Sequence, residues 1–350
     1  MEKYYTRACN FYYGPTSKTK VKKKLSLPLH GNELISFDSL EIITRNLIKK
    51  INIKEIKYQK KNLKKKIKQD LKQVTKKKSF KKLNLLKSPI LIGVLNLTPD
   101  SFSDGGRYTK KNLGYKHVTK LIKSGCEIID IGGESTRPGS IEVEKIKEWK
   151  RIKSTLNRLK KLKKTISLDT RKSWIMEKGI KNKASIINDI SGFSYDLNTL
   201  NVLKKYKISF IINHIQGTPK TMQKNPKYKN VLLDVYDYFD KKIKILRKIG
   251  IKHNNIILDP GIGFGKNLKH NITLLSNISI FHSLGFPILL GTSRKRFIKD
   301  LSGKHDSKER IGGTISSILY GMMQGVQFFR VHDANEINQS IKVFKSLNYS

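Results

Sequence analysis

Short apolar runs alternate with longer amphipathic segments along the chain from Ile90 onward. The runs are rich in β-branched residues and have the length of buried strands, whereas the segments between them favour helices. We predict eight strands, at Ile90–Leu95, Glu127–Ile131, Thr165–Leu168, Ser185–Ile187, Ile208–Ile212, Asn255–Leu258, Pro287–Leu290 and Val326–Val331. Predicted helices include Lys110–Ser124, Glu142–Lys161, Val231–Ile249 and Ile311–Gln324. Repeated strand–helix units of this number predict an α/β fold, the (β/α)8 TIM barrel.

Residues 1–87 follow a different pattern and carry many more basic than acidic residues. Leu34–Ile43 alternates enough to predict a strand, while the Lys-rich stretch Lys54–Lys82 favours a helix with a weak apolar stripe. We therefore expect a small, irregular, basic N-terminal extension with a linker at 1–87, and the catalytic barrel at 88–350. Pro89 marks the point at which the repeated pattern begins.

The composition gives the chain a formal net charge of +45. The positive electrostatic field of such a charge attracts polyanions, so it would ordinarily indicate a nucleic acid or an anionic membrane surface as partner. Most of the basic residues are Lys rather than Arg, and Ile and Asn are also abundant, as A+T-rich codons would produce. We therefore predict no specific nucleic acid and no membrane partner, and expect the field to attract phosphorylated substrates.

Cysteine usage and the lack of long apolar runs point to the cytoplasm. Cys9 and Cys126 lie far apart and have no neighbouring metal-ligand spacing, so neither a disulfide framework nor a zinc site is expected. Met1–Tyr13 has no apolar run of signal-peptide length, and no later stretch has the roughly 18 apolar residues of a membrane span. We expect a soluble, cytoplasmic protein.

Polar residues follow every predicted strand. They are Asn96, Gly132–Arg137, Asp169–Thr170, Asn188–Asp189, Asn213–His214, Asp259–Gly261, Gly291–Lys295 and His332–Asp333, the last pair after Arg330. Because the reactive side chains of a TIM barrel come from the carboxyl ends of its strands, we expect these residues to share one site.

The residue types indicate the kind of ligand. Asp169, Asn188 and Asp259 offer acceptors for a heterocycle rich in N–H donors. Arg330, His332, Arg137 and Thr136 offer donors of the kind that hold phosphate. The glycines of Asp259–Lys266 could let the backbone approach a ligand.

Each of these residues also has a structural interpretation. Asp169 and Asp259 could each cap the helix that follows, and His214 and His332 could be buried structural histidines. Lys266 could be either solvated or next to the ligand.

Two long segments resemble the paired signatures of the dihydropteroate synthase family. They are Asn96–Gly106 and Asp130–Gly139. Further resemblance follows in the family's order at Ser167–Thr170, Ile187–Gly192, Asn213–Pro219, Asp259–Lys266, Gly291–Lys295 and Arg330–Asp333. The resemblance extends from Ile90 to the carboxyl terminus and leaves the extension unexplained.

The resemblance implies a TIM-barrel transferase of folate biosynthesis, the target of sulfonamides. Such an enzyme condenses 6-hydroxymethyl-7,8-dihydropterin pyrophosphate with p-aminobenzoate to give 7,8-dihydropteroate and pyrophosphate. Mg2+ is the expected cofactor, and a homodimer is the expected assembly. In the family, the loops that correspond to Asn96–Gly106 and Ser135–Ser140 close over the site.

The resemblance also implies a role for individual residues. The pterin would be held by Asp169, Asn188, Asp259 and Lys295. The pyrophosphate would be held by Asn96, Arg330, His332, Thr136 and Arg137, with Asn96 also close to the Mg2+ ion. The p-aminobenzoate pocket would be formed by Thr136, Pro138, Phe264 and Lys295. Two positions depart from the family: Ile215 stands where Met is usual, and Arg296 where many members have Ser near the p-aminobenzoate carboxylate.

Two other functions remain open at this stage. A pterin-binding barrel that transfers a methyl group from methyltetrahydrofolate to a corrinoid protein would have a similar pterin pocket. Such an enzyme has no pyrophosphate to hold, so Ser135–Gly139 and the Arg330/His332 pair argue against it. A nucleic-acid-binding protein on a degenerate barrel would need aromatic residues within its basic run, and Lys54–Lys82 offers only Tyr58 and Phe80.

Overall fold

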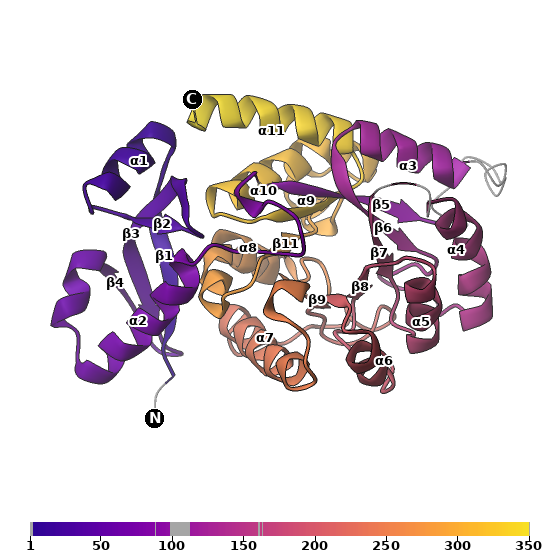
Figure 1. Ribbon diagram of the computed structural model, residues 1–350, viewed down its shortest axis with the longest axis horizontal. Coiled ribbons are helices and arrows are strands. Elements are labelled where there is room, and N and C mark those ends of the chain that lie inside the picture. The colour runs from indigo at the N-terminus through magenta and orange to yellow at the C-terminus, as the bar shows by residue number, and fades with distance from the viewer. Residues whose placement is uncertain (1–2, 88, 99–112, 160–161, 163, 350) are drawn as a thin grey trace.

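The computed structural model describes residues 3–87, 89–98, 113–159, 162 and 164–349 (Figure 1). It contains a four-stranded antiparallel sheet near the amino terminus and an eight-stranded parallel sheet formed by the rest of the chain. Figure 1 shows the small sheet and its helices beside the barrel.

The parallel sheet contains every predicted strand. Its members are β5 (Ile90–Asn96), β6 (Cys126–Gly132), β7 (Thr165–Asp169), β8 (Ile186–Asp189), β9 (Ser209–Asn213), β10 (Ile256–Asp259), β11 (Leu289–Leu290) and β12 (Phe328–Val331). They are ordered β10-β9-β8-β7-β6-β5-β12-β11, and a parallel bridge between Leu258 and Ile288 joins the two end strands. The predicted TIM barrel is therefore confirmed.

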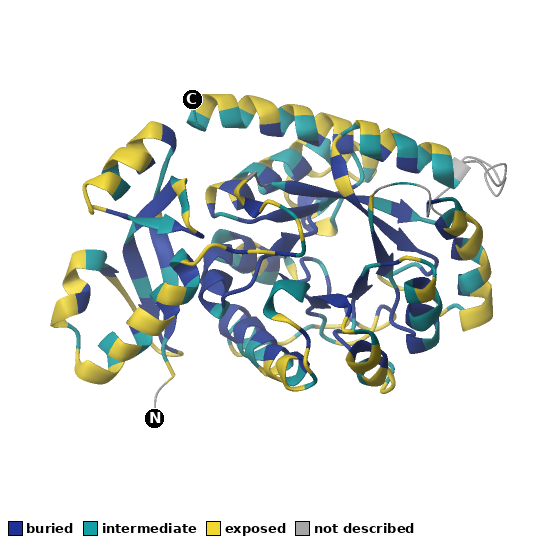
Figure 2. Ribbon diagram, in the orientation of Figure 1, coloured by how far each residue is buried: buried dark blue, intermediate teal, exposed yellow. Residues whose placement is uncertain are grey.

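Helices cover the outside of the barrel. They are α3 (Leu113–Lys123), α4 (Lys145–Leu159), α5 (Ser173–Lys181), α6 (Thr199–Tyr206), α7 (Val231–Lys248), α8 (Leu268–Ser276), α9 (Arg296–Ser302), α10 (Ile311–Met323) and α11 (Ala334–Tyr349). Their apolar faces pack on strands that are buried on both sides, as parallel sheets require (Figure 2). The start of the predicted helix Lys110–Ser124 lies outside the described residues.

The extension is a regular α+β subdomain, so the expected irregular structure was wrong. It consists of β1 (Tyr5–Tyr13), α1 (Gly14–Lys22), β2 (Leu27–Leu29), β3 (Asn32–Ile43), β4 (Ile48–Asn52), a 3-10 turn (Ile53–Tyr58) and α2 (Lys61–Thr75). The predicted strand Leu34–Ile43 lies within β3. In α2, Leu63, Ile67, Leu71 and Val74 form a narrow apolar stripe that packs on the core of the small sheet. The surrounding lysines hide this stripe in the sequence, although a row of this width is enough to bury one helix face.

The segment after α2 closes the amino end of the barrel. Phe80 is fully buried and packs edge-to-face on Phe328 of β12, with ring centroids 5.5 Å apart. Phe80 and Leu85 belong to the same apolar cluster as inward-facing residues of the strands, among them Ile92 and Ile257. The stretch expected to be a basic linker therefore completes the barrel core.

Polar contacts join the subdomain to the barrel. The Tyr5 hydroxyl donates to Asp237 Oδ2 on α7 at 2.9 Å, and Ser279 Oγ donates to the Ala8 carbonyl at 3.0 Å. Arg45 pairs with Asp234 and Asp237. Cys9 and Cys126 are buried free thiols. Among the described residues, no helix is long and apolar enough to cross a membrane.

Candidate active site

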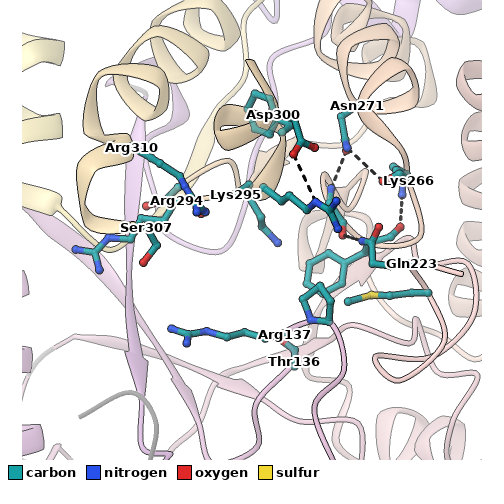
Figure 3. Close-up of a pocket in the computed structure, with 18 of the residues that line it drawn as sticks. Thr136, Arg137, Gln223, Lys266, Asn271, Arg294, Lys295, Asp300, Ser307 and Arg310 are labelled. Carbon is teal, nitrogen blue, oxygen red and sulfur yellow. Dashed lines mark hydrogen bonds and ion pairs between the residues drawn. The ribbon is translucent and has the colours of Figure 1, made fainter. Parts of the chain in front are cut away.

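A cavity of about 700 Å3 opens at the carboxyl ends of the barrel strands. Its wall includes most of the site residues predicted from the sequence: Asn96, Thr136, Arg137, Pro138, Asp169, Phe264, Lys295, Arg330 and His332. Figure 3 shows Arg137 and Lys295 reaching into this space from different elements. The structure thus brings together residues that are up to 236 positions apart, from Asn96 to His332.

Two predicted residues, Asn188 and Asp259, lie behind the wall. They are 1% and 2% exposed, respectively. Asp259 is nevertheless close to the cavity, because a Cβ added to the lining residue Gly291 would lie 3.9 Å from Asp259 Oδ2 and 3.6 Å from Arg330 Nε. Asn188 donates from Nδ2 to Asp130 Oδ2 at 2.9 Å. Both residues therefore belong to the deep end of the same site.

Arg330 is the cation at the centre of this deep end. Its Nη1 lies 3.2 Å from Asp130 Oδ2 and 3.5 Å from Asp169 Oδ2. Burial and the neighbouring Asp130 raise the pKa of Asp169 well above its usual value, and Arg330 opposes this shift. Burial also raises the pKa of Asp259, again against the effect of Arg330. One guanidinium thus opposes the rise in the pKa values of both Asp169 and Asp259, although burial outweighs it.

Several buried polar atoms at this end have no hydrogen-bond partner among the described residues. They are Asp130 Oδ1, Asn188 Oδ1 and both side-chain polar atoms of Asn213. A buried polar group without a partner costs about 1–3 kcal/mol. Since donors and acceptors are both unpaired, the deep end is suited to a flat heterocycle that presents both.

Sequence reasoning did not assign a ligand role to Asp130 or Asn213. The sequence contains a signal for each of them. Asp130 is a single acid between Ile129 and Ile131 inside an apolar strand. Asn213 ends β9 and is in register with Asp259 at the end of β10. A charge within a buried strand requires a partner, which here is Arg330.

Lys295 and Phe264 form an enclosed side of the cavity. Lys295 Nζ lies 3.9 Å from the centroid of the Phe264 ring. Part of Lys295 stays open to the cavity, but loss of water around its ammonium group and the nearby Arg330 lower its pKa to about 7. Gly263 has φ +81°, and a Cβ there would approach Lys295 Cδ to 3.1 Å, so glycine suits this position.

His332 lines the cavity as a neutral ring. Its Nδ1 lies 3.0 Å from Ser293 Oγ, and burial lowers its pKa to about 3. Next to it, Arg294 forms a two-point ion pair with Asp333. Arg296, the departure from the family pattern, is exposed and lies 3.5 Å from Asp300 through Nε.

The geometry excludes helix capping by Asp169 and Asp259 and supports a structural role for His214. Asp259 Oδ1 accepts from the Gly261 N–H at 2.8 Å, but α8 is capped by Asn267 and the residue before α5 is Lys172, so neither aspartate caps a helix. His214 is a buried structural histidine, as one interpretation held: its Nδ1 lies 2.9 Å from Lys266 Nζ.

Lys266 is 2% exposed, so it is not solvated; it supports the loop after β10 and also borders the cavity. Its Nζ donates to the carbonyls of Gly261 and Phe264 at 3.0 and 2.9 Å, and burial lowers its pKa to about 7. A Cβ on Gly261 would come within 1.9 Å of the His214 carbonyl, at φ +65°. That glycine therefore permits contact with the neighbouring loop, rather than with a ligand.

A buried ionic network supports the loop that carries Thr136, Arg137 and Pro138. Glu134 accepts from Lys172 Nζ at 2.8 Å, from Arg171 Nε at 3.0 Å and from the Val143 N–H at 2.7 Å. Lys172 also pairs with Glu148 at 2.7 Å. These contacts fix both ends of the loop. The other loop that the resemblance expects to close over the site is Asn96–Gly106, and from residue 99 onward it lies outside the described residues.

Comparison with known proteins agrees with this geometry. A family model described as pterin binding enzyme matches residues 92–332. The dihydropteroate synthase of Escherichia coli strain K12 is 39% identical over 75% of this chain and 92% of its own length. That of Bacillus subtilis strain 168 is 36% identical over 76% of this chain and 90% of its own.

Solved structures show the same similarity. Yersinia pestis dihydropteroate synthase with a sulfonamide drug complex is 35% identical, with a TM-score of 0.72 over 76% of this chain and 96% of its own. The Thermus thermophilus enzyme in complex with 4-aminobenzoate is 32% identical, with a TM-score of 0.68 over 76% of this chain and 96% of its own.

The fold, the deep polar pocket and the family match place the chain among the pterin-binding barrel enzymes. Within that class it belongs to the dihydropteroate synthase family. Its reaction is the transfer of a pterin group to p-aminobenzoate in folate biosynthesis.

Proposed function

We propose that the cavity holds both substrates at once, with the pterin at the deep end and p-aminobenzoate nearer the mouth. The observation that carries this proposal is the group of unpaired polar atoms around Arg330, on Asp130, Asn188 and Asn213. An aminopyrimidine edge supplies the donors and acceptors that these atoms lack. Asp169, Asn188, Asp259 and Lys295 are the pterin residues, and we add Asp130 and Asn213 to them.

The pyrophosphate is assigned to Asn96, Thr136, Arg137, Arg330 and His332, all on the cavity wall. In the reaction, the bond from the pterin methylene carbon to the pyrophosphate oxygen breaks, and its electron pair leaves with pyrophosphate. Fixed N–H donors stabilise the charge that develops on that oxygen. A neutral His332 can still donate one ring N–H to it.

The p-aminobenzoate is assigned to Thr136, Pro138, Phe264 and Lys295. Phe264 offers an aromatic face, and Lys295 above it offers a cation whose pKa of about 7 is sensitive to a nearby carboxylate. The amine nitrogen forms the new bond to the methylene carbon and loses a proton. No covalent enzyme intermediate is needed, and the buried Cys126 begins β6, at the end of the barrel opposite the cavity.

Asn96 fits the expected Mg2+ ion as a single oxygen ligand. Among the described residues, no group of three or more His, Cys, Asp or Glu side chains could hold a metal. Mg2+ commonly binds through one or two protein oxygens together with substrate phosphates and water. When bound, the ion would neutralise charge on the pyrophosphate, and Asn96 would orient it.

The remaining assignments concern the whole chain. A homodimer, a cytoplasmic location and the absence of a specific nucleic-acid partner are part of this proposal. The buried, unpaired thiols of Cys9 and Cys126 support a reducing compartment. We also propose that 1–87 and 88–350 are the two units of the chain, although Phe80 packs with the second.

Substitution of Phe264 tests where each substrate binds. Phe264→Leu should raise the KM for p-aminobenzoate about tenfold, because an aromatic contact contributes roughly 0.5–1.5 kcal/mol beyond its buried area. The Kd of a pterin without phosphates, measured by calorimetry, should stay unchanged. Phe297→Leu, in the same cavity wall, is the control. Loss of pterin affinity with no change in KM would reverse the assignment of the two ends.

A further inference from the structure

Three residues outside the active-site cavity, which we call the Arg171 cluster, join the loop after β6 (residues 135–141) to the loop after β8. Arg171 follows β7, Tyr195 follows β8, and Glu142 directly follows the loop after β6. None of the three is among the described residues that line the cavity, whereas the loop after β6 lines it through residues 136–138. The cluster can therefore act on a substrate through that loop.

Burial of apolar side chains does little to hold the loop after β6. Ile141 is 86% exposed, and residues 137–139 are exposed as well. The tip of the loop is joined to the loop after β9, because the Gly139 N–H donates to the Pro219 carbonyl at 3.0 Å. A loop with so little buried apolar surface depends on polar contacts to keep one conformation.

Arg171 contacts both ends of this loop. It is 8% exposed, and its Nε donates to Oε2 of Glu134, the residue immediately before the loop, at 3.0 Å. Its Nη2 lies 3.9 Å from Oε2 of Glu142, the residue immediately after the loop. The guanidinium also lies over the Tyr195 ring, with Cζ 4.1 Å from the ring centroid. A planar cation can make these polar and aromatic contacts at the same time.

Tyr195 joins the same carboxylate, because its hydroxyl donates to Glu142 Oε1. Burial and this hydrogen bond raise the pKa of Tyr195 to about 12, so the hydroxyl remains a donor at neutral pH. The Tyr195 N–H donates to Ser191 Oγ at 3.2 Å. The next residue, Asp196, accepts from the Ser173 N–H at 2.8 Å. The ring therefore stands on a segment that is itself fixed to the turn after β8 and to α5.

We propose that Arg171, Tyr195 and Glu142 are positioning residues for p-aminobenzoate, which hold the loop after β6 where its residues 136–138 contact this substrate. This role rests on the p-aminobenzoate pocket of the proposed function. The groups assigned to the pterin ring lie on other elements, strands β6 to β10 and Lys295. Loss of the Arg171 cluster therefore weakens the binding of p-aminobenzoate and leaves the binding of the pterin ring intact.

Tyr195→Phe removes the hydroxyl and keeps the ring, so the fold should persist. We expect the KM for p-aminobenzoate to rise roughly threefold to tenfold, the scale of a hydrogen bond to a partly exposed carboxylate. The Kd of a pterin without phosphates, measured by calorimetry, should stay unchanged. Tyr206→Phe is the matched control, because the Tyr206 hydroxyl on α6 donates to Glu177 on α5 at 2.7 Å. It should change neither constant.

A double-mutant cycle tests whether the residues act through one another. Glu142→Gln should raise the KM for p-aminobenzoate, and adding it to Tyr195→Phe should raise the KM little further, because the hydroxyl acts through Glu142. Arg171→Met should raise the KM more than Tyr195→Phe does, since it releases both ends of the loop. Arg171→Lys should restore only part of the loss, because an ammonium group lacks the planar face. Circular dichroism checks the folding of each variant.

Hydrogen exchange tests the loop directly and does not depend on catalysis. The Gly139 N–H donates to Pro219, and the Val143 N–H donates to Glu134. In Tyr195→Phe both amides should exchange roughly fivefold faster, because the loop opens locally more often. Tyr206→Phe should leave both exchange rates unchanged.

Three results would overturn the proposal. They are an unchanged KM for p-aminobenzoate in folded Tyr195→Phe, unchanged exchange of the Gly139 and Val143 amides, or an additive effect of Tyr195→Phe and Glu142→Gln. An equal loss of pterin affinity would also contradict it, because the cluster would then support the whole barrel. If the unmodified chain forms no dihydropteroate, the assigned reaction is wrong, and the exchange rates still decide whether the Arg171 cluster holds the loop.

Discussion

Arg330 determines the electrostatics of the active site at the scale of single residues. It lies within 3.5 Å of both Asp130 and Asp169, and it opposes the burial-induced rise in the pKa values of Asp169 and Asp259. The guanidinium therefore opposes protonation of these carboxylates, although burial still raises both of their pKa values. This arrangement also places the guanidinium next to the leaving group in the proposed binding mode.

Asp259→Asn tests the pterin end. The amide can still accept from the Gly261 N–H, so the fold should persist, but it presents a weaker acceptor to the pterin. We expect pterin affinity to fall by about 2–3 kcal/mol, the scale of a charged hydrogen bond. Calorimetry with a pterin lacking phosphates measures this, with the exposed rim variant Asp300→Asn as control. Unchanged affinity for Asp259→Asn would move pterin recognition elsewhere.

Arg330→Ala tests the pyrophosphate end. We expect kcat to fall by roughly 10²–10³-fold, about 3–4 kcal/mol, because the guanidinium acts most strongly as charge develops on the departing oxygen. Affinity for the pterin without phosphates should fall much less. Steady-state kinetics beside a binding titration separates the two effects. Equal losses in both would mean that Arg330 mainly maintains the pterin pocket.

The sequence predicted many of the residues that line the cavity, because strand ends in a barrel meet at one face. It did not reveal that Asn188 and Asp259 lie behind the cavity wall, since depth along the barrel depends on how the strands are staggered. Nor did it single out Asp130, whose partner Arg330 is 200 positions away. Residues so far apart along the chain come into contact only because the barrel closes, and no local sequence pattern indicates such a contact.

At the scale of elements, the segment after α2 has the largest difference between expected and observed structure. Lys-rich composition indicated a basic linker, but Phe80 within it is fully buried at the amino end of the barrel. A single aromatic residue among lysines produces almost no periodic signal. Phe80 is recognised as a core residue only in the folded barrel, where Phe80 and Leu85 pack with the inward-facing residues of the strands.

Phe80→Ala should therefore destabilise the barrel. Removing a buried Phe side chain typically costs 3–5 kcal/mol, through lost burial and the remaining cavity. Urea unfolding followed by circular dichroism measures the free energy of unfolding. Tyr58→Ala, at a side chain that is 76% exposed, is the control. A change of less than about 1 kcal/mol for Phe80→Ala would show that the segment is a dispensable linker.

At the scale of the whole molecule, buried histidines couple stability to pH. His282 is fully buried between barrel and subdomain; its Nε2 lies 2.7 Å from the Gln324 carbonyl, and its ring lies edge-on to His30, with centroids 4.2 Å apart. Burial lowers the pKa of His282 from 6.5 to about 3. Burial also holds the pKa values of His30 and His214 well below their usual range.

These histidines should make the protein acid-sensitive. Below pH 6.5 the unfolded chain protonates His282 but the folded chain does not until about pH 3. The free energy of unfolding should thus fall, by about 1.4 kcal/mol per pH unit from this residue, as pH drops through that window. His282→Gln should reduce the slope between pH 6 and 4.5 in urea unfolding, and His305→Gln, at an exposed position, should not. An unchanged slope in folded His282→Gln would contradict this account.

In the proposed function, one cavity joins a pterin to p-aminobenzoate. The direct measurement is an assay of the purified full chain with 6-hydroxymethyl-7,8-dihydropterin pyrophosphate, p-aminobenzoate and Mg2+, which follows both products. We expect 7,8-dihydropteroate and pyrophosphate to appear in equal amounts, and product formation to stop when p-aminobenzoate is withheld. Folded protein that forms no dihydropteroate under these conditions would contradict it.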